Sequence, residues 1–199
     1  MSTIKTNKLV HTANGASEFT LPTADGSAGQ VLKTDGSGNL SWTTPGITQA
    51  DQWRVTSSFD TADSDVTSNW ARNDTDFSLI GSGMTESSGI FTFPATGIYK
   101  VDWVVNAFRM PSGATLRQIG GYIYTTTDNS NYNIRAKTDN SISTDNYASS
   151  TCYMSCIFDV TNTSTHKVKF GVFAEAEMRY EGTSDKNTTH ATFLRLGDT

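Results

Sequence analysis

The sequence contains few charged residues and no cluster of basic ones. Lysine, arginine, aspartate and glutamate make up 18% of its 199 residues, and the formal net charge is −5. A nucleic-acid-binding surface needs lysine and arginine gathered together, so this distribution argues against one. A mildly acidic surface also disfavours unspecific attachment to DNA and anionic lipid. We therefore expect neither nucleic acid nor membrane among the partners.

Long apolar runs are missing as well. No stretch approaches the roughly 18 apolar residues of a membrane span, and Met1–Lys8 lacks the apolar core of a signal peptide. The abundance of Ser, Thr, Asn, Asp and Gly is nevertheless typical of extracellular β-rich adhesins and fibres. A virion component, made in a host cytoplasm and released by lysis, reconciles the two observations. A cytoplasmic β-protein is the plainer alternative.

Cysteine is scarce, with only Cys152 and Cys156. On one strand these residues lie about 13 Å apart, at roughly 3.3 Å per residue. A disulfide needs Cα atoms within about 7 Å of each other. The spacing is also a poor zinc signature, because no histidine or second cysteine pair is close in sequence. We expect two free, buried thiols.

Motifs of catalysis are absent. The sequence has no Gly-x-Ser-x-Gly elbow, no His-Glu-x-x-His pair and no phosphate-binding loop, and His11, His166 and His190 are isolated from one another. Paired carboxylates for glycoside cleavage would have to come from scattered loop positions. We expect a protein that is not an enzyme, with a polysaccharide-degrading enzyme as a remote alternative.

The sequence does contain the alternation of apolar and polar residues that is typical of β-strands. In Gly97–Phe108 the alternate residues Tyr99, Val101, Trp103, Val105 and Ala107 are apolar, as in a strand half-buried on a core. Short strands separated by turn residues recur to the C-terminus and predict an all-β sandwich or barrel. The strands expected in this part are Gln52–Val55, Phe77–Ile80, Gly89–Phe93, Gly97–Phe108, Gln118–Thr126, Ile134–Lys137, Thr151–Val160, Lys167–Ala176 and Thr189–Leu196.

The N-terminal part divides into two short segments. Residues 1–20 hold two expected strands, Thr3–Val10 and Glu18–Leu21, around an Asn14-Gly15 turn, with too little apolar surface to fold alone. Residues 21–47 contain a hairpin, Gln30–Thr34 and Asn39–Thr43, turning at Asp-Gly. A lone hairpin is marginal in water. We expect three copies to pack around an axis and bury Val31 or Leu32, Leu40 and Trp42.

Residues 48–199 resemble the C1q and tumour-necrosis-factor family. The resemblance rests on Phe91, Pro94, Gly97 and Tyr99, which match Phe-x-x-Pro-x-x-Gly-x-Tyr, and on Phe193 in a matching last strand. It implies a jelly-roll sandwich that assembles as a compact homotrimer, and we expect the motif residues, together with Trp103 in the same long strand and Phe193, to belong to the trimer core. The collagen-like stalk of the animal proteins is missing. The hairpin in its place resembles a stretch found in tail-fibre and appendage proteins of bacteriophages.

Together these features predict a structural protein on the outer surface of a bacteriophage virion. Residues 1–20 would dock on capsid or tail proteins, 21–47 would form an intertwined trimeric stalk, and 48–199 would project as heads. Such a tail or head fibre would hold a host-surface glycan or protein by avidity. A capsid decoration or cement protein, which stabilises the shell, is the alternative.

Two groups of residues are candidates for binding. Tyr124, Tyr132, Tyr147 and Tyr180 lie in or beside polar loops, and tyrosine suits contact with sugars or proteins. Asp60, Asp63 and Asp65 offer the oxygen ligands that calcium prefers, but the later glutamate of a full calcium loop is missing. For the tyrosines, ordinary loop anchoring or trimer packing is favoured over ligand binding. For the aspartates, a solvated loop is favoured over a calcium site. No other cofactor is implied.

Overall fold

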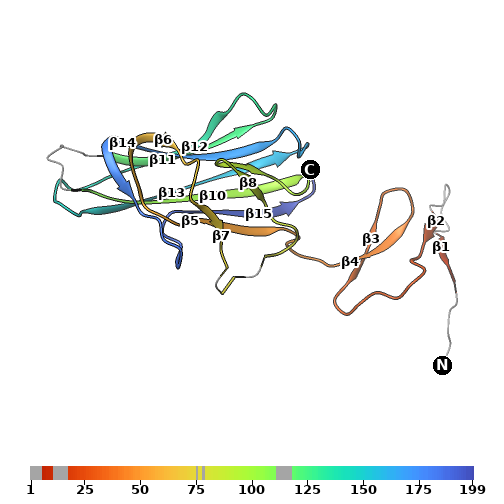
Figure 1. Cartoon of the computed structure of the whole chain (residues 1–199). Helices are drawn as coiled ribbons and strands as arrows, with labels where there is room; N and C mark the ends of the chain where they lie inside the picture. The colour runs from red at the N-terminus through yellow and green to blue at the C-terminus, as the bar shows by residue number, and fades with distance from the viewer. Residues whose placement is uncertain (1–5, 11–17, 75, 78, 111–117) are drawn as a thin grey trace. The chain divides into compact units, whose positions relative to one another are not determined.

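The computed structural model describes residues 6–10, 18–74, 76–77, 79–110 and 118–199, whose regular structure is all β. The chain divides into two units, residues 1–46 and 47–199 (Figure 1). No helix in the described residues is long and apolar enough to cross a membrane. The all-β architecture follows from the alternation of apolar and polar residues noted above.

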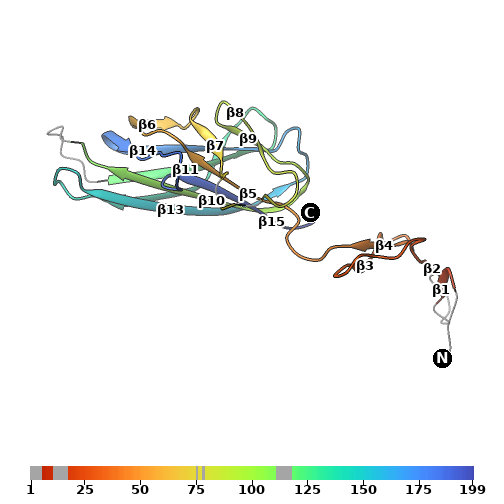
Figure 2. The same cartoon turned by 60° about the horizontal axis from the view of Figure 1, so that its bottom comes forward.

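The C-terminal unit is a sandwich of two antiparallel sheets, seen as two layers in Figures 1 and 2. Sheet one has the order β7 (Trp70–Arg72), β5 (Ala50–Val55), β15 (His190–Gly197), β10 (Gly97–Phe108) and β13 (Ser149–Val160). Sheet two has the order β12 (Asn133–Ser141), β11 (Gln118–Thr126) and β14 (Lys167–Tyr180). On the other side of β14, β6 (Phe59–Asp65) and β9 (Ile90–Thr92) pair with different parts of the strand. The last strand, β8 (Thr85–Ser87), pairs with β9. A short pairing of β10 with the end of β14 joins the two sheets.

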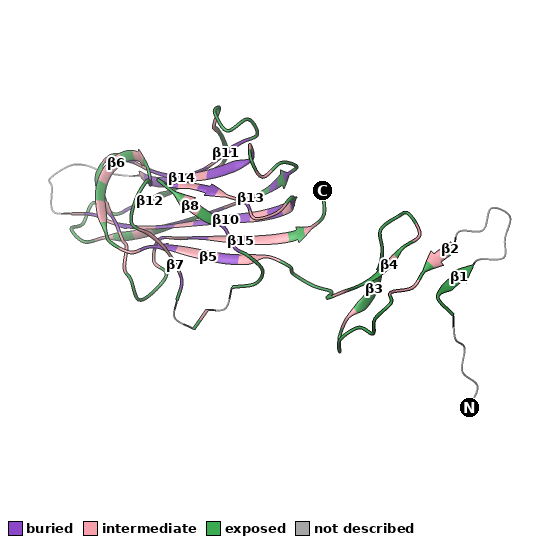
Figure 3. Ribbon diagram, turned by 45° about the vertical axis from the view of Figure 1, so that its right-hand side comes forward, coloured by how far each residue is buried: buried purple, intermediate pink, exposed green. Residues whose placement is uncertain are grey.

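Aromatic rings fill the space between the sheets. Trp103 is completely buried, lies 4.9 Å from Phe170 between ring centroids and donates its indole N–H to the carbonyl of Gly171 at 3.1 Å. Phe91 contacts Trp70 edge-on at 5.0 Å and Phe193 at 5.3 Å. Offset and edge-to-face rings such as these add specific attraction to the burial of apolar area. Figure 3 shows the resulting alternation of buried and half-buried residues along β10.

The observed strands follow the predicted ones where the alternation is strong. The predictions Gly97–Phe108 and Gln118–Thr126 are confirmed to the residue as β10 and β11. The predicted strand Phe77–Ile80 is wrong, because among its described residues only Ile80 pairs, in a single bridge to Ala50. The segment around Asp60 was expected to be a loop but forms β6, whose polar residues pair with β14 at the edge of sheet two.

The two cysteines lie on β13, and neither forms a disulfide, as predicted. Cys152 is buried and Cys156 is half-buried. Burial, followed by the charge of Asp139 for Cys152 and of Asp102 for Cys156, raises the pKa of both thiols to about 11. Thiols with such pKa values are weakly nucleophilic at neutral pH, so the pair is structural.

The N-terminal unit consists of two small hairpins. One pairs β1 (Lys8–Val10) with β2 (Glu18–Thr20), and the other pairs β3 (Val31–Thr34) with β4 (Leu40–Thr43). The Asp35-Gly36 turn of the second hairpin is confirmed, with the Asp35 carboxylate accepting from the backbone N–H of Ser37 at 2.8 Å. The predicted Asn14-Gly15 turn lies outside the described residues.

None of the described residues of the N-terminal unit is buried, as the green and pink colouring of Figure 3 shows. Val31 is 47% exposed and Trp42 38%, while Leu40 is half-buried. The indole of Trp42 lies over Gly26 and donates its N–H to the carbonyl of Ala24 at 2.9 Å. One copy of the unit therefore leaves much of the apolar surface of the predicted stalk open to water.

A buried carboxylate ties sheet one to the loop that precedes β8. Asp51, 3% exposed, accepts two hydrogen bonds from Arg72, one from the indole of Trp53 and one from the backbone N–H of Met84. Breaking such a buried pair leaves the remaining partners without an acceptor. We expect Asp51→Ala to lower the free energy of unfolding by about 2–3 kcal/mol.

Urea unfolding of Asp51→Ala and the unchanged chain at equal protein concentration measures this loss. Glu177→Ala, which removes an exposed carboxylate on β14, is the matched control and should change stability by less than about 0.5 kcal/mol. Equal losses in the two variants would show that the Asp51 network contributes nothing beyond surface charge.

Candidate functional site

The outer surface of sheet two carries a cluster of aromatic rings and lysines, named here the aromatic face. Its rings lie close together, since the centroid of Tyr122 is 5.4 Å from that of Tyr124 and 5.9 Å from that of Phe173. Two ammonium groups lie over these rings. The members of the aromatic face are Tyr122, Tyr124, Tyr132, Phe173, Lys137 and Lys169.

The ammonium groups make cation–π contacts at typical distances. Nζ of Lys137 lies 4.6 Å from the ring centroid of Phe173, and Nζ of Lys169 lies 5.0 Å from Tyr124 and 4.9 Å from Tyr132. Lys169 also forms an ion pair with Asp65 of β6 at 2.5 Å. The lysines thus hold the rings in place from the solvent side.

Strand register explains how these residues meet. Across β12, β11, β14 and β6, one row runs Asp139, Gly120, Phe173, Asp63, and the next runs Lys137, Tyr122, Gly171, Asp65. A third row pairs Ile134 with Tyr124 and Tyr124 with Lys169. Residues in register on adjacent strands have their side chains on one side of the sheet. The sheet therefore brings together residues up to about a hundred positions apart in sequence.

Two glycines leave room for the rings. A Cβ at Gly120 would lie 2.6 Å from a ring carbon of Phe173, and a Cβ at Gly171 would lie 3.0 Å from a ring carbon of Tyr124. A side chain at position 120 would therefore displace the Phe173 ring, and one at position 171 would make a tight contact with the Tyr124 ring, so glycine at both positions favours rings that lie across the sheet. Covering a strand glycine with an aromatic ring also stabilises the sheet.

The phenols of the aromatic face lie near carboxylates. Burial, with the charges of Asp65 and Asp63 and the neighbouring Tyr122, raises the pKa of Tyr124 to about 12. Burial and the charges of Asp63 and Asp139 raise the pKa of Tyr122 as well. The hydroxyl oxygen of Tyr132 is enclosed and has no hydrogen-bond partner among the described residues. The face thus holds neutral phenols at all physiological pH values.

The raised pKa of Tyr124 predicts a loss of stability in alkali. The ordinary tyrosine pKa is 10, so between pH 10 and about 12 the unfolded chain releases this proton while the folded chain keeps it. Stability is complete below pH 10 and should fall as pH rises through this window. In urea unfolding at stepped pH, Tyr124→Phe should flatten the fall, and an unchanged slope would contradict the assignment.

A second surface, named here the association face, lies on the opposite side of the sandwich. On the outer side of sheet one, Ile157 is 61% exposed and Tyr153 53%, and Leu196 on β15 is 54% exposed. In register, Ile157 lies beside Lys100 and Tyr153 beside Val104, and Leu194 lies on the other side of Lys100. The residues of the association face are Ile98, Val104, Leu194, Leu196, Tyr153 and Ile157.

Three polar groups at the centre of the association face, those of Lys100, Asp102 and Tyr153, bond to one another. Asp102 accepts from Nζ of Lys100 at 2.7 Å and from the hydroxyl of Tyr153 at 2.8 Å. Burial alone would raise the pKa of Asp102, but the hydrogen bonds from Lys100, Ser155 and Tyr153 outweigh it and lower that pKa. A surface whose charges are already paired can be covered at less cost than one with a lone charge.

The predicted binding tyrosines lie in different places. Tyr124 and Tyr132 are on the aromatic face, joined through Lys169. Tyr147 is 68% exposed on the loop before β13, which is a strand of sheet one. Tyr180 contradicts the prediction, since it is fully buried and stacked on Phe59 at 5.3 Å. It ends the apolar side of β14, which continues four residues beyond the predicted strand.

The motif residues that carry the family resemblance lie in the core of a single copy. Phe91, Tyr99, Trp103 and Phe193 are each at most 1% exposed. Gly97 has φ +144°, and a Cβ there would lie 2.6 Å from the carbonyl oxygen of Gly197. Half-buried Pro94 lies in the turn just before this glycine. These residues therefore build the sandwich and are not exposed for association.

The calcium candidates bind cations of the protein itself. Asp60 forms two hydrogen bonds with Arg179, both at 2.7 Å, and Asp65 pairs with Lys169. Asp63 lies on the same strand and is exposed. Within the described part of the chain, no three His, Cys, Asp or Glu side chains gather as a metal site would require. The structure gives Asp60 and Asp65 a role in joining β6 to β14 and leaves the carboxylate of Asp63 exposed.

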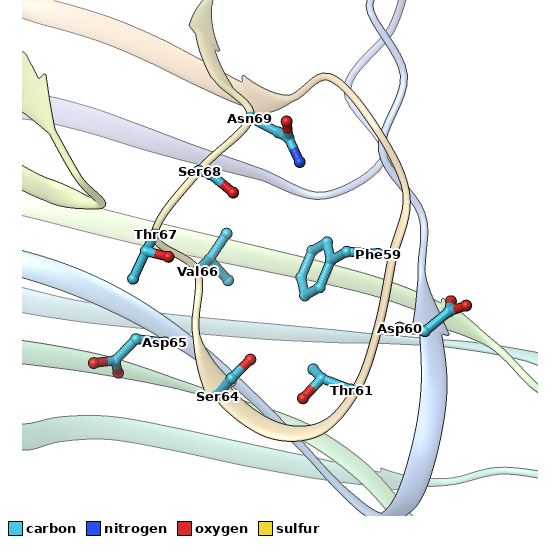
Figure 4. A pocket seen from close by; sticks show the side chains of 9 residues that line it. All are labelled: Phe59, Asp60, Thr61, Ser64, Asp65, Val66, Thr67, Ser68 and Asn69. Atoms are coloured by element: carbon cyan, nitrogen blue, oxygen red, sulfur yellow. The ribbon is translucent and has the colours of Figure 1, made fainter.

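A small pocket of about 300 Å³ lies inside the loop that joins β6 to β7. Figure 4 shows Phe59 and Val66 facing each other across it, with Asp60 and Asp65 directed outward on opposite sides. Both carboxylates are used in the ion pairs just described. The pocket is therefore left with hydroxyl and amide groups, and it offers no charged group to a ligand.

The fold of the C-terminal unit is that of tumour necrosis factor ligands. Murine APRIL is 15% identical over 74% of this chain and 98% of its own, with a TM-score of 0.55. Eiger TNF from S. frugiperda is 12% identical over 75% of this chain and 93% of its own, with a TM-score of 0.57. No family model and no curated protein matches the sequence. The predicted jelly-roll sandwich is confirmed, and at these identities the likeness shows the fold alone.

Proposed function

We propose that this protein is a trimeric, non-enzymatic attachment fibre on the surface of a bacteriophage virion. The observation that carries the proposal is the contrast between the two sheets. Sheet one exposes an apolar surface with paired charges, which suits contact with further copies of the chain. Sheet two exposes the aromatic face, which would stay accessible in every copy.

Three copies are proposed because the C1q and tumour-necrosis-factor family, whose fold the unit shares, assembles as homotrimers. Tyr153, Ile157 and Leu196 of the association face are each more than half exposed in one copy, and burial in an interface would remove them from water. Interfaces of this kind combine an apolar centre with satisfied polar groups. The Lys100–Asp102–Tyr153 network would supply the latter.

The N-terminal unit is proposed as stalk and anchor. Its described residues include exposed Leu9, Val31, Leu32 and Trp42 and no buried residue at all. A unit of this kind gains stability by association with its own copies or with a larger assembly. Residues 21–47 would then form the intertwined stalk, and residues 1–20 would dock on other virion proteins.

Sedimentation and labelling test the proposal. The full chain should sediment as a trimer at micromolar concentration, and a monomer would refute the assembly. Gold-labelled antibodies on phage particles should mark a tail or head fibre. Label spread over the shell, with loss of capsid heat stability when the protein is removed, would establish the decoration role instead. Release of reducing ends from host envelope would refute the non-enzymatic assignment.

A further inference from the structure

The rings of the aromatic face are oriented to offer their flat sides. Gly120 and Gly171 leave space beneath Phe173 and Tyr124, so these rings lie across the sheet instead of standing upright from it. Lys137 and Lys169 lie over the flat sides of Phe173 and Tyr124, with Nζ 4.6 Å and 5.0 Å from the ring centroids. Lys137 is exposed on β12, so its flexible head can move from Phe173 to a bound ligand, while Lys169 stays paired with Asp65. The C–H groups of a sugar ring contact aromatic rings through such flat sides.

Hydrogen-bonding groups border the rings on both sides. Asp139 lies at one end of the row that contains Phe173, where it accepts from Nε2 of Gln118 at 2.5 Å, and exposed Asp63 lies at the other end. Lys137 lies beside Tyr122 in the next row. Hydroxyl groups can both donate to the carboxylates and accept from the lysines. The surface thus alternates apolar rings with polar groups of both kinds.

We propose that the aromatic face binds a neutral oligosaccharide, with sugar rings stacked on Tyr122, Tyr124 and Phe173 and hydroxyls bonded to Asp63, Asp139 and Lys137. The inference rests on the proposed attachment function and names the class of receptor that this function would use. It places the contact on sheet two of each copy and not in the sheet-one interface. Three such faces on one trimer could bind at the same time, so that weak individual contacts together give tight attachment by avidity.

Charge selects a neutral sugar over an acidic one. Lys169 is already paired with Asp65, which leaves Lys137 against the two carboxylates Asp63 and Asp139. Burial, followed by the charges of these two carboxylates, raises the pKa of Tyr122. This excess of carboxylates would repel the negative charge of a uronate or sialate, whereas a neutral hydroxyl group would donate a hydrogen bond to one of them.

Calorimetric titration of the full chain with defined hexasaccharides tests the proposal. The probes are neutral maltohexaose, cellohexaose, mannohexaose and chitohexaose, and acidic hexagalacturonate. We expect at least one neutral probe to bind and the acidic one not to bind. Tyr122→Ala and Phe173→Ala should each weaken that binding roughly ten-fold. Tyr147→Ala, which removes an exposed tyrosine from a loop outside the face, should leave it unchanged.

A second measurement protects against variants that fail to fold. Chemical-shift changes in the unchanged chain should map to the aromatic face when the bound hexasaccharide is added. Absence of binding by all neutral probes at millimolar concentration would overturn the inference, as would tighter binding of hexagalacturonate or shifts confined to another surface. A chain that is monomeric and still binds a neutral sugar would refute the trimer and leave this inference intact.

Discussion

Replacement of Trp103 by alanine should cost about 3–5 kcal/mol of unfolding free energy, the largest loss expected from any single substitution considered for this chain. Trp103 has no exposed surface and lies between Trp70, at 5.4 Å, and Phe170, at 4.9 Å, measured between ring centroids. Alanine would leave a cavity that the two rings cannot fill without leaving their own contacts. The carbonyl of Gly171 would also lose its indole donor.

The space around Trp103 is also closed by the backbone of sheet two. A Cβ added at Gly121 would lie 2.8 Å from Met154 and 3.1 Å from the indole nitrogen of Trp103. Backbone of sheet two therefore already approaches the indole as closely as it can, so collapse of the cavity from that direction is limited. The loss from Trp103→Ala should accordingly fall in the upper part of the range for tryptophan truncation.

Denaturant unfolding at fixed protein concentration measures the effect, because association would otherwise shift the apparent stability. Trp103→Phe keeps much of the apolar volume but removes the N–H, so it should lose less than Trp103→Ala. Tyr147→Ala removes a side chain that is 68% exposed and should change stability by less than about 0.5 kcal/mol. A loss below about 1 kcal/mol for Trp103→Ala would mean that the sandwich does not enclose this ring as described.

The sandwich could be predicted from the sequence because its long strands are half-buried. Successive residues of β10 are buried and half-buried in turn, and this produces the alternation of apolar and polar residues that predicts a strand. Strand β6 was missed because its residues, Phe59–Asp65, are mostly polar and its partner β14 lies more than a hundred residues away. An edge strand of this kind is recognised only through its neighbour, since its own sequence resembles a loop.

The aromatic face could be predicted only in part. Tyr124 and Tyr132 were singled out by their position near polar loops, but Tyr122 and Phe173 were not. The available signal was the pair Gly120-Gly121 inside an otherwise apolar strand, since an interior strand glycine indicates a close approach of another group. Which ring approaches Gly120 depends on the register of β14, and register between distant strands is not encoded in local sequence.

Replacement of Ile157 by lysine should dissociate the proposed trimer without unfolding the subunit. Ile157 is 61% exposed in a single copy, so the substitution removes little core. In the assembly it would place a second cation beside Lys100, its neighbour in register, whose own carboxylate partner is Asp102. An unpaired buried charge costs about 3 kcal/mol or more, which weakens association at least ~100-fold.

Ile134→Lys is the matched control, because Ile134 is 50% exposed and lies on β12 of the opposite sheet. Sedimentation velocity across a dilution series should show monomers of Ile157→Lys at concentrations where the unchanged chain and Ile134→Lys remain trimers. Equal thermal unfolding of the diluted monomers would confirm that the subunit fold is intact. The reverse result, with Ile134→Lys dissociating and Ile157→Lys trimeric, would move the interface to sheet two. The aromatic face would then be covered in the assembly. Sheet two would be the association surface, and sheet one would be the surface left open for binding.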